Sequence, residues 1–100
     1  MKGHLELLLL ATLADDPRHG YALVERLRER SAGIFDLSEG TVYPALYRLE
    51  RAKLVSSRWS EASGRRRRIY SLTQKGRRTL ATERKEWTAF TAAVDGVVGT

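Results

Sequence analysis

Four consecutive arginines, Arg65 to Arg68, are the most chemically distinctive residues in this chain of 100 residues. Their guanidinium groups stay charged at physiological pH and present planar arrays of N–H donors that match phosphate oxygens. Positive charges placed side by side repel one another unless an anion relieves them. The run therefore predicts a polyanionic partner, such as nucleic acid or an anionic membrane surface.

The basic excess of the chain is confined to the region around this run. Residues 1–64 carry nine basic and nine acidic groups, whereas residues 65–85 carry nine basic groups and a single acid, Glu83. The formal net charge of +6 at pH 7 therefore originates in one short stretch. Scattered lysines and arginines usually form only a solvated surface, but this clustering favours a surface that binds a polyanion.

A second set of side chains suited to binding lies between Ser38 and Arg51. Val42, Leu46 and Leu49 recur at helical spacing and define one buried stripe. The opposite side of the same predicted helix presents Thr41, Tyr43, Pro44, Tyr47, Arg48 and Arg51. Tyrosines and arginines on one helix face suit phosphates, base edges and thymine methyl groups.

Two starts of this helix are compatible with Pro44. If the hydroxyl of Ser38 caps the helix, Pro44 lies inside it, removes a backbone hydrogen bond and presses on the carbonyl of Gly40. If Thr41 is the cap, Pro44 falls in the first turn at little cost. A violation of local rules is typical of functional segments, although a proline that only sets the helix start is the alternative.

Helices and a hairpin must position these two groups of side chains. The turn at 15–20 ends a first helix, and Gly20 there is free to adopt an unusual backbone angle. Segments that alternate like strands flank the arginine run and predict a two-stranded hairpin, with Ile69 or Leu72 packed inward. The predicted elements are, in chain order, helices over 5–14, 21–30 and 38–51, strands over 54–59 and 67–72, and a helix from 74 to about 94.

The composition excludes several classes of function. The chain has no cysteine, and its two histidines, His4 and His19, are too few for a histidine-rich metal site. Phosphate-binding glycine loops and zinc-protease motifs are absent from the sequence. The first apolar run is interrupted by Glu6 and ends at Pro17, which is too short for a membrane span or a secretory signal. We therefore expect a cytoplasmic protein that is not an enzyme and needs no cofactor, metal or membrane.

The order of helix, helix, helix, basic hairpin and helix predicts a winged helix-turn-helix. In this fold one helix enters the major groove and the hairpin wing reaches the adjacent backbone or minor groove. The predicted fold class is thus mainly α with a small two-stranded β-hairpin wing. We assign residues 1–72 to a DNA-binding domain and residues 73–100 to a C-terminal dimerisation helix with a short tail.

The chain resembles the PadR family of bacterial transcriptional regulators in three motifs of matching order and spacing: Gly20 to Leu23, Ser38 to Leu46 with Leu49 and Glu50, and Gly64 to Gly76. The resemblance covers roughly residues 5–80 and implies a dimeric repressor of the subfamily with a single C-terminal helix. Where the family pattern has a glycine after the recognition helix, this chain has Lys53. A lysine can hold a left-handed turn there at a cost of ~1–2 kcal/mol.

The predicted DNA contacts come from the third helix and from the wing. Because successive strand residues alternate faces, only about half of the four arginines can reach the same groove. Two weaker phosphate candidates, Tyr21 and Lys75, could equally be a core tyrosine and a solvated lysine. The complete set is Ser38, Thr41, Tyr43, Pro44, Tyr47, Arg48, Lys53, Arg65, Arg66, Arg67, Arg68, Tyr21 and Lys75.

The last helix carries an apolar seam with nearly heptad spacing, which predicts a dimer interface. Trp87 either fills this interface or, as the resemblance implies, lines a pore between subunits that accepts flat hydrophobic molecules. Trp59 in the hairpin is assigned to covering Leu54 or Leu72. The residues predicted at the dimer interface are Leu8, Leu80, Trp87, Phe90 and Val94.

These expectations combine into one function and two alternatives. We expect a homodimer that represses transcription from a palindromic operator in double-stranded DNA, with half-sites about one helical turn or a multiple apart. A small aromatic or hydrophobic effector would relieve the repression. The alternatives are a winged-helix protein–protein adaptor and a small-molecule sensor that does not read DNA, neither of which needs four contiguous arginines.

Overall fold

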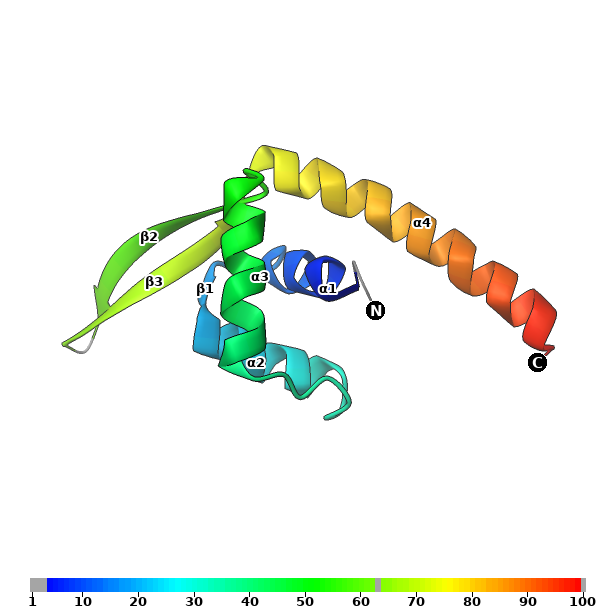
Figure 1. Cartoon of the computed structure of the whole chain (residues 1–100), viewed down its shortest axis with the longest axis horizontal. Helices are drawn as coiled ribbons and strands as arrows, with labels where there is room; N and C mark the ends of the chain where they lie inside the picture. The colour runs from blue at the N-terminus through cyan, green and yellow to red at the C-terminus, as the bar shows by residue number, and fades with distance from the viewer. Residues whose placement is uncertain (1–3, 63, 100) are drawn as a thin grey trace.

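The first three helices cluster together, and the wing and the last helix extend from this cluster in opposite directions (Figure 1). The computed structural model describes residues 4–62 and 64–99. Its elements are α1 (His4–Leu13), β1 (Arg18–His19), α2 (Gly20–Arg30), α3 (Glu39–Arg51), β2 (Val55–Ala62), β3 (Arg65–Leu72) and α4 (Gln74–Val98). The mainly helical fold with a β wing is therefore as predicted.

The hydrophobic core lies where α1, α2 and α3 meet the inner end of the wing. Helix α1, which is apolar on nearly every face, packs against α2, α3, α4 and β3. The predicted stripe of Val42, Leu46 and Leu49 is fully buried, so α3 turns its other side outward. The core is completed by Leu9, Leu10, Leu13, Leu23, Val24, Leu27, Ala45, Val55, Tyr70, Leu72 and Leu80.

The sheet has three strands in the order β1-β3-β2, rather than the two strands predicted. In the segment predicted as a turn, Arg18 pairs with Tyr70 and His19 pairs with Ile69. A strand of two residues has no alternation that a sequence pattern could reveal. Its pairing joins the start of α2 to the wing.

Gly20 is needed for a different reason from the one predicted. It is the first residue of α2 and does not have a positive φ. The space where its side chain would lie is filled by the ring of Tyr43 from α3. Close approach of two helices, and not an unusual backbone angle, therefore explains the glycine.

Helix α3 begins at Glu39 with Ser38 at the N-cap position, so Pro44 lies inside the helix. The expected capping hydrogen bond is not formed. The Ser38 hydroxyl instead lies 3.2 Å from the hydroxyl of Thr41, and both side chains are exposed. The two hydroxyl groups are thus held together at the start of the exposed face of α3.

Helix α3 ends in the left-handed turn predicted at Lys53, whose φ is 66°. The N–H of Leu54 donates to the backbone carbonyl of Leu49 at 2.9 Å, and the N–H of Lys53 donates to the backbone carbonyl of Glu50 at 3.0 Å. This pair of hydrogen bonds satisfies carbonyls that a helix end otherwise leaves free. The glycine typical of such turns is therefore dispensable in this chain.

The start of α4 is bound directly to this turn. The Thr73 hydroxyl donates to the Lys53 carbonyl at 2.6 Å and accepts from the N–H of Gly76 at 3.0 Å. A Cβ on Gly76 would lie 2.1 Å from the carbonyl oxygen of Leu54. The orientation of α4 is consequently fixed relative to the end of α3.

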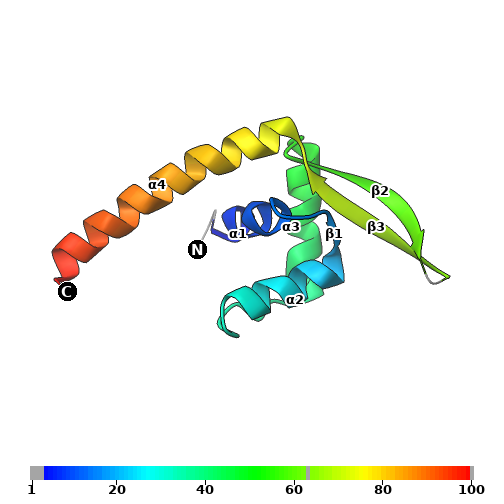
Figure 2. The ribbon, with the colours of Figure 1, turned by 180° about the vertical axis from the view of Figure 1, so that it is seen from behind.

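The outer part of α4 projects beyond the other helices (Figures 1 and 2). The helix continues to Val98, four residues past its predicted end near Val94. Leu80 is only 3% exposed and belongs to the core of its own chain, so its assignment to the dimer interface is corrected. Trp87, Phe90 and Val94 are exposed, and Leu8 on α1 is half-buried.

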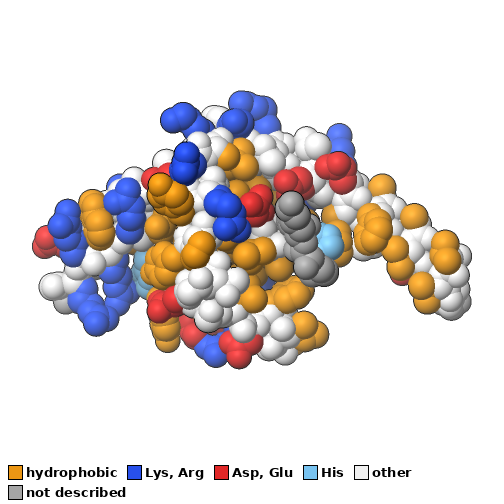
Figure 3. All heavy atoms as spheres, in the orientation of Figure 1, with side chains coloured by type: hydrophobic (Ala, Val, Ile, Leu, Met, Phe, Trp, Pro, Cys, Tyr) orange, Lys and Arg blue, Asp and Glu red, His pale blue; other side chains and the backbone are white. Residues whose placement is uncertain are grey.

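Basic and apolar side chains gather over different parts of the surface. Basic side chains gather over the wing and over the first turns of α4, whereas apolar side chains cover the outer part of α4 (Figure 3). Within the described residues, no helix has the length and apolar character needed to cross a membrane. The two surfaces therefore suit two different partners.

Candidate nucleic-acid interface

The outward face of α3 carries the aromatic and polar side chains that the sequence predicted there. Tyr47 is 61% exposed, and Tyr43, Pro44 and Thr41 are exposed beside it. The Arg51 guanidinium lies 5.7 Å from the centre of the Tyr47 ring. Such a face offers apolar rims, hydroxyl groups and positive charge to a groove of DNA.

Arg48 lies on the side of α3 that faces α1. Its Nε is 3.7 Å from a carboxylate oxygen of Glu6, and both side chains remain accessible to water. An exposed ion pair of this kind contributes little stability. Arg48 can therefore exchange Glu6 for a phosphate at low cost.

Trp59 lies between arginines on one face of the wing. The Arg66 and Arg68 guanidinium groups lie 4.4 Å and 5.1 Å from the centre of its ring. The ring is 53% exposed, so the prediction that Trp59 covers Leu54 or Leu72 is wrong. Because strand residues alternate, Arg65 and Arg67 point to the opposite face of the hairpin.

Arg68 also joins the wing to the last turns of α3. Its Nε donates to the Ser57 hydroxyl at 2.8 Å, and its Nη2 lies 3.8 Å from the Glu50 carboxylate. The Ser57 hydroxyl donates to the same carboxylate at 2.5 Å. Arg68 thus sets the position of the wing relative to α3 and has less freedom than its neighbours to reach a phosphate.

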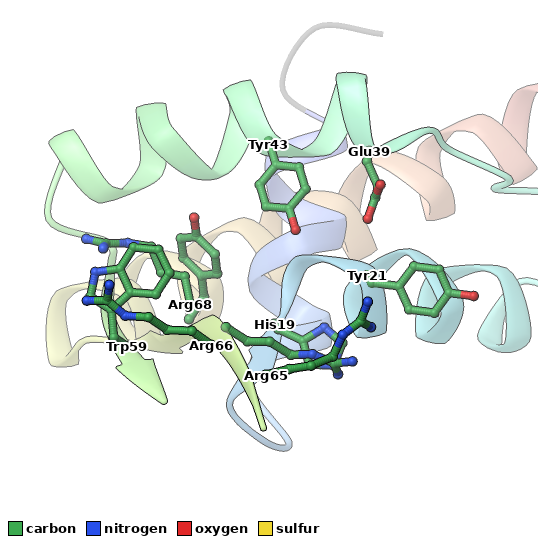
Figure 4. A pocket seen from close by; sticks show the side chains of 10 residues that line it. His19, Tyr21, Glu39, Tyr43, Trp59, Arg65, Arg66 and Arg68 are labelled. Atoms are coloured by element: carbon green, nitrogen blue, oxygen red, sulfur yellow. The ribbon is translucent and has the colours of Figure 1, made fainter. Parts of the chain in front are cut away.

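A hollow of about 680 Å³ separates the wing from the start of α2 and from α3. The four arginines and Trp59 line it on the wing side, and His19, Tyr21 and Tyr43 line it on the helix side. Figure 4 shows the Tyr43 hydroxyl pointing from α3 into this hollow. The two sets of residues singled out in the sequence are thereby brought to the rims of one site.

Tyr43 keeps its proton in this environment. Burial, followed by the charge of Glu39, raises the pKa of the Tyr43 hydroxyl, and the opposing effect of Arg67 is smaller. A phenol that stays neutral can donate a hydrogen bond to an anionic oxygen. Tyr43 therefore offers a donor to the hollow as well as packing against Gly20.

His19 is a member of the site that the sequence analysis did not assign. Its Nδ1 accepts from the N–H of Ala22 at 3.3 Å and so caps α2, while its Nε2 lies 2.8 Å from Arg67 Nη1. Burial, and then the charge of Arg67, lower the pKa of His19 below its ordinary value. Its place directly before a helix start was the available signal, but histidine is not among the usual capping residues.

The two weaker phosphate candidates have different surroundings. Tyr21 is exposed and its ring stacks on His19, with centroids 6.4 Å apart, so it is not a core tyrosine. The Lys75 ammonium donates to the Ala52 carbonyl at 3.1 Å and thus caps the end of α3. Lys53, at the left-handed turn, is exposed.

Comparison with known families agrees with this architecture. Residues 9–82 match the model described as the transcriptional regulator PadR-like family. The chain belongs to this family. The matched segment runs from within α1 into α4, so it contains every residue of the hollow between wing and helices. PadR-like proteins are transcriptional regulators and not enzymes.

Individual relatives extend the match over most of the chain. Transcriptional regulator Rv3488 of Mycobacterium tuberculosis is 36% identical over 81% of this chain and 73% of its own. A PadR family regulator from Clostridium difficile R20291 has 33% identity and a TM-score of 0.88, covering 97% of this chain and all of its own. One from Eggerthella lenta has 30% identity and a TM-score of 0.85, covering 99% and 85%.

Proposed function

We propose that this PadR-like regulator is a homodimeric repressor that binds a palindromic operator in double-stranded DNA. The observation that carries the proposal is the placement of two surfaces around one hollow. The exposed face of α3 and the arginines of the wing lie on either side of it. Helix α3 then reads base edges in the major groove while the wing neutralises phosphates nearby.

The exposed apolar side of α4 supports the homodimer. Trp87 and Phe90 contact each other with ring centroids 5.9 Å apart, and Phe90 is 55% exposed. With Val94 they form an exposed apolar strip on the outer part of α4. A second copy of α4 would cover this strip, and the resulting two-fold axis requires an operator with two-fold symmetry.

A second hollow, of about 410 Å³, supports the idea of an effector. It lies between α1 and α4, and Leu7, Leu8, Ala11, Phe35 and Trp87 give it a mainly apolar wall. An indole at its edge suits a flat aromatic molecule, which can stack on it. Binding there would change the angle between α1 and α4 and thereby the spacing of the two α3 helices in the dimer.

Selection from a pool of randomised duplexes tests the proposed function. The wild-type protein should enrich sequences with two-fold symmetry and half-sites about one helical turn or a multiple apart. Sedimentation of the selected complex should give two chains per duplex. If the selection enriches no sequence, or only sequences without two-fold symmetry, the proposal is overturned. If the chain instead binds a protein partner and no DNA, the adaptor alternative is favoured.

A further inference from the structure

His19 lies between two hydrogen-bond donors, the N–H of Ala22 and the Arg67 guanidinium, and a neutral imidazole can accept from only one of them. Neutral imidazole has one nitrogen that donates and one that accepts, and a guanidinium group only donates. His19 Nδ1 is already used as the acceptor for the N–H of Ala22 in the first turn of α2. With Nδ1 as the acceptor in the cap, the proton of the neutral ring is on Nε2, which lies 2.8 Å from the Nη1 donor of Arg67.

Protonation of His19 would not resolve this conflict. The imidazolium form would lose the cap of α2 and would place a second positive charge against Arg67. The pKa of His19 is accordingly lowered, first by burial and then by Arg67, so the ring is neutral at pH 7. In this tautomer two N–H donors lie 2.8 Å apart, and an anionic oxygen beside both nitrogens would accept from both.

The surroundings of this pair favour an anionic ligand. His19 and Arg67 lie in the hollow between the wing and α3, where the other three arginines of the run and the Tyr43 hydroxyl are further donors. The carboxylate of Glu39 lines the same hollow and opposes an anion. The four arginines outnumber this one carboxylate, so the net positive charge of the lining favours a polyanion such as the DNA backbone.

We propose that His19 Nε2–H and the Arg67 guanidinium bind one phosphodiester oxygen of the DNA backbone. This inference rests on the proposed function and adds a contact to it. A phosphate bound in this way contacts both the start of α2, through His19, and the wing, through Arg67. Because β1 already joins these elements, the bound phosphate would fix the wing against the helix-turn-helix.

Two substitutions separate the donor role of His19 from its capping role. In His19→Asn the amide oxygen can replace Nδ1 as the cap, whereas the Nε2 donor is lost. In His19→Gln the amide nitrogen can replace Nε2, whereas the cap is lost. We expect His19→Asn to weaken binding of the selected operator about three- to tenfold at unchanged melting temperature. His19→Gln should lower the melting temperature and retain more of the affinity.

The salt dependence and the coupling with arginine provide a second readout. Arg67→Gln should reduce the slope of log K against log salt by about 0.9, because one fewer counterion is released. His19→Asn should leave that slope unchanged, since a neutral donor releases none. The double variant His19→Asn/Arg67→Gln should raise the operator Kd by less than the product of the two single fold-increases, because both groups bind one phosphate. Lys53→Gln, at the left-handed turn outside this hollow, is the control and should combine with His19→Asn multiplicatively.

The outcomes distinguish this contact from the proposed function. If the wild type binds the operator and His19→Asn binds it equally well, the phosphate contact is wrong while the regulator proposal stands. If the wild type binds no duplex, both fail. Inorganic phosphate at matched ionic strength should leave the NMR signal of His19 Nε2 in place, whereas the operator duplex should shift it. A shift with inorganic phosphate and none with the duplex would overturn the assignment to DNA.

Discussion

Gly20 of α2 and Tyr43 of α3 approach so closely that a Cβ on Gly20 would lie 2.4 Å from the Tyr43 ring. The ring of Tyr43 consequently packs against Gly20 at the start of α2, while its hydroxyl points into the hollow beside the wing (Figure 4). This relationship ties the two helices of the helix-turn-helix together at the surface that we assign to DNA.

Gly20→Ala should therefore destabilise the fold. Alanine normally stabilises a helix relative to glycine, but here its methyl group would displace the Tyr43 ring. We expect the free energy of unfolding to fall by about 1–3 kcal/mol, as for overpacked sites in general. Urea unfolding measures this change. The double variant Gly20→Ala/Tyr43→Ala should recover most of the loss, and a Gly20→Ala protein as stable as the wild type would contradict the account.

Removing the indole of Trp59 should weaken DNA binding without unfolding the wing. The ring is exposed and holds the Arg66 and Arg68 guanidinium groups by cation–π contacts, each of which is worth about 0.5–1 kcal/mol at an exposed site. Trp59→Thr, which keeps a residue that favours strands, should raise the operator Kd about two- to fivefold. Trp59→Phe is the matched control because it keeps an aromatic face. A large drop in melting temperature for Trp59→Thr would assign the ring to stability instead.

The stability of the protein should decrease as the pH falls below 6.5 because of His19. The pKa of His19 is lowered in the folded state from its ordinary value of 6.5, so the unfolded chain takes up a proton first. The stabilisation is complete above pH 6.5 and is lost as the pH falls toward the folded-state pKa. Melting temperatures of the wild type and His19→Asn between pH 7.5 and 5 measure this effect. Identical pH dependence of the two proteins would rule it out.

Phe90→Glu should convert the dimer to monomers that remain folded. Phe90 is exposed in the single chain, so a charge there costs the isolated fold little, but it would be buried in a dimer interface without a partner. Sedimentation should show one chain per particle and an unchanged circular dichroism spectrum. Ala92→Glu, on the opposite side of α4, is the control. Persistence of the dimer in Phe90→Glu would move the interface elsewhere.

The features that sequence reasoning predicted correctly are those with a local pattern. The stripe of Val42, Leu46 and Leu49 repeats at helical spacing, and its burial determines which side of α3 faces outward. The left-handed turn at Lys53 was predicted from the glycine that the family pattern has after the recognition helix. Each of these depends on neighbouring residues, which the sequence displays together.

The features that were missed depend on contacts between distant segments. Strand β1 exists only because His19 pairs with Ile69, fifty residues later. The exposed position of Trp59 follows from its register opposite Arg68, in the outer part of the hairpin beyond the buried residues Tyr70 and Leu72. Leu80 fits the heptad spacing of an interface, but the orientation of α4 at its junction with α3 directs the Leu80 side chain toward the core of its own chain. Periodicity within one element cannot distinguish these outcomes.

The most direct test of the account is the preference of Tyr47→Ala for the selected operator over random duplex. Tyr47 is exposed on the outward face of α3 and has no close packing partner like the one that Gly20 is for Tyr43, so its loss should leave the fold intact. If α3 reads the major groove, the Kd for random duplex divided by the Kd for the operator should fall by about tenfold or more. The Kd for random duplex itself should change little. An unchanged ratio in a folded Tyr47→Ala protein would contradict the assignment of α3 as the reading helix.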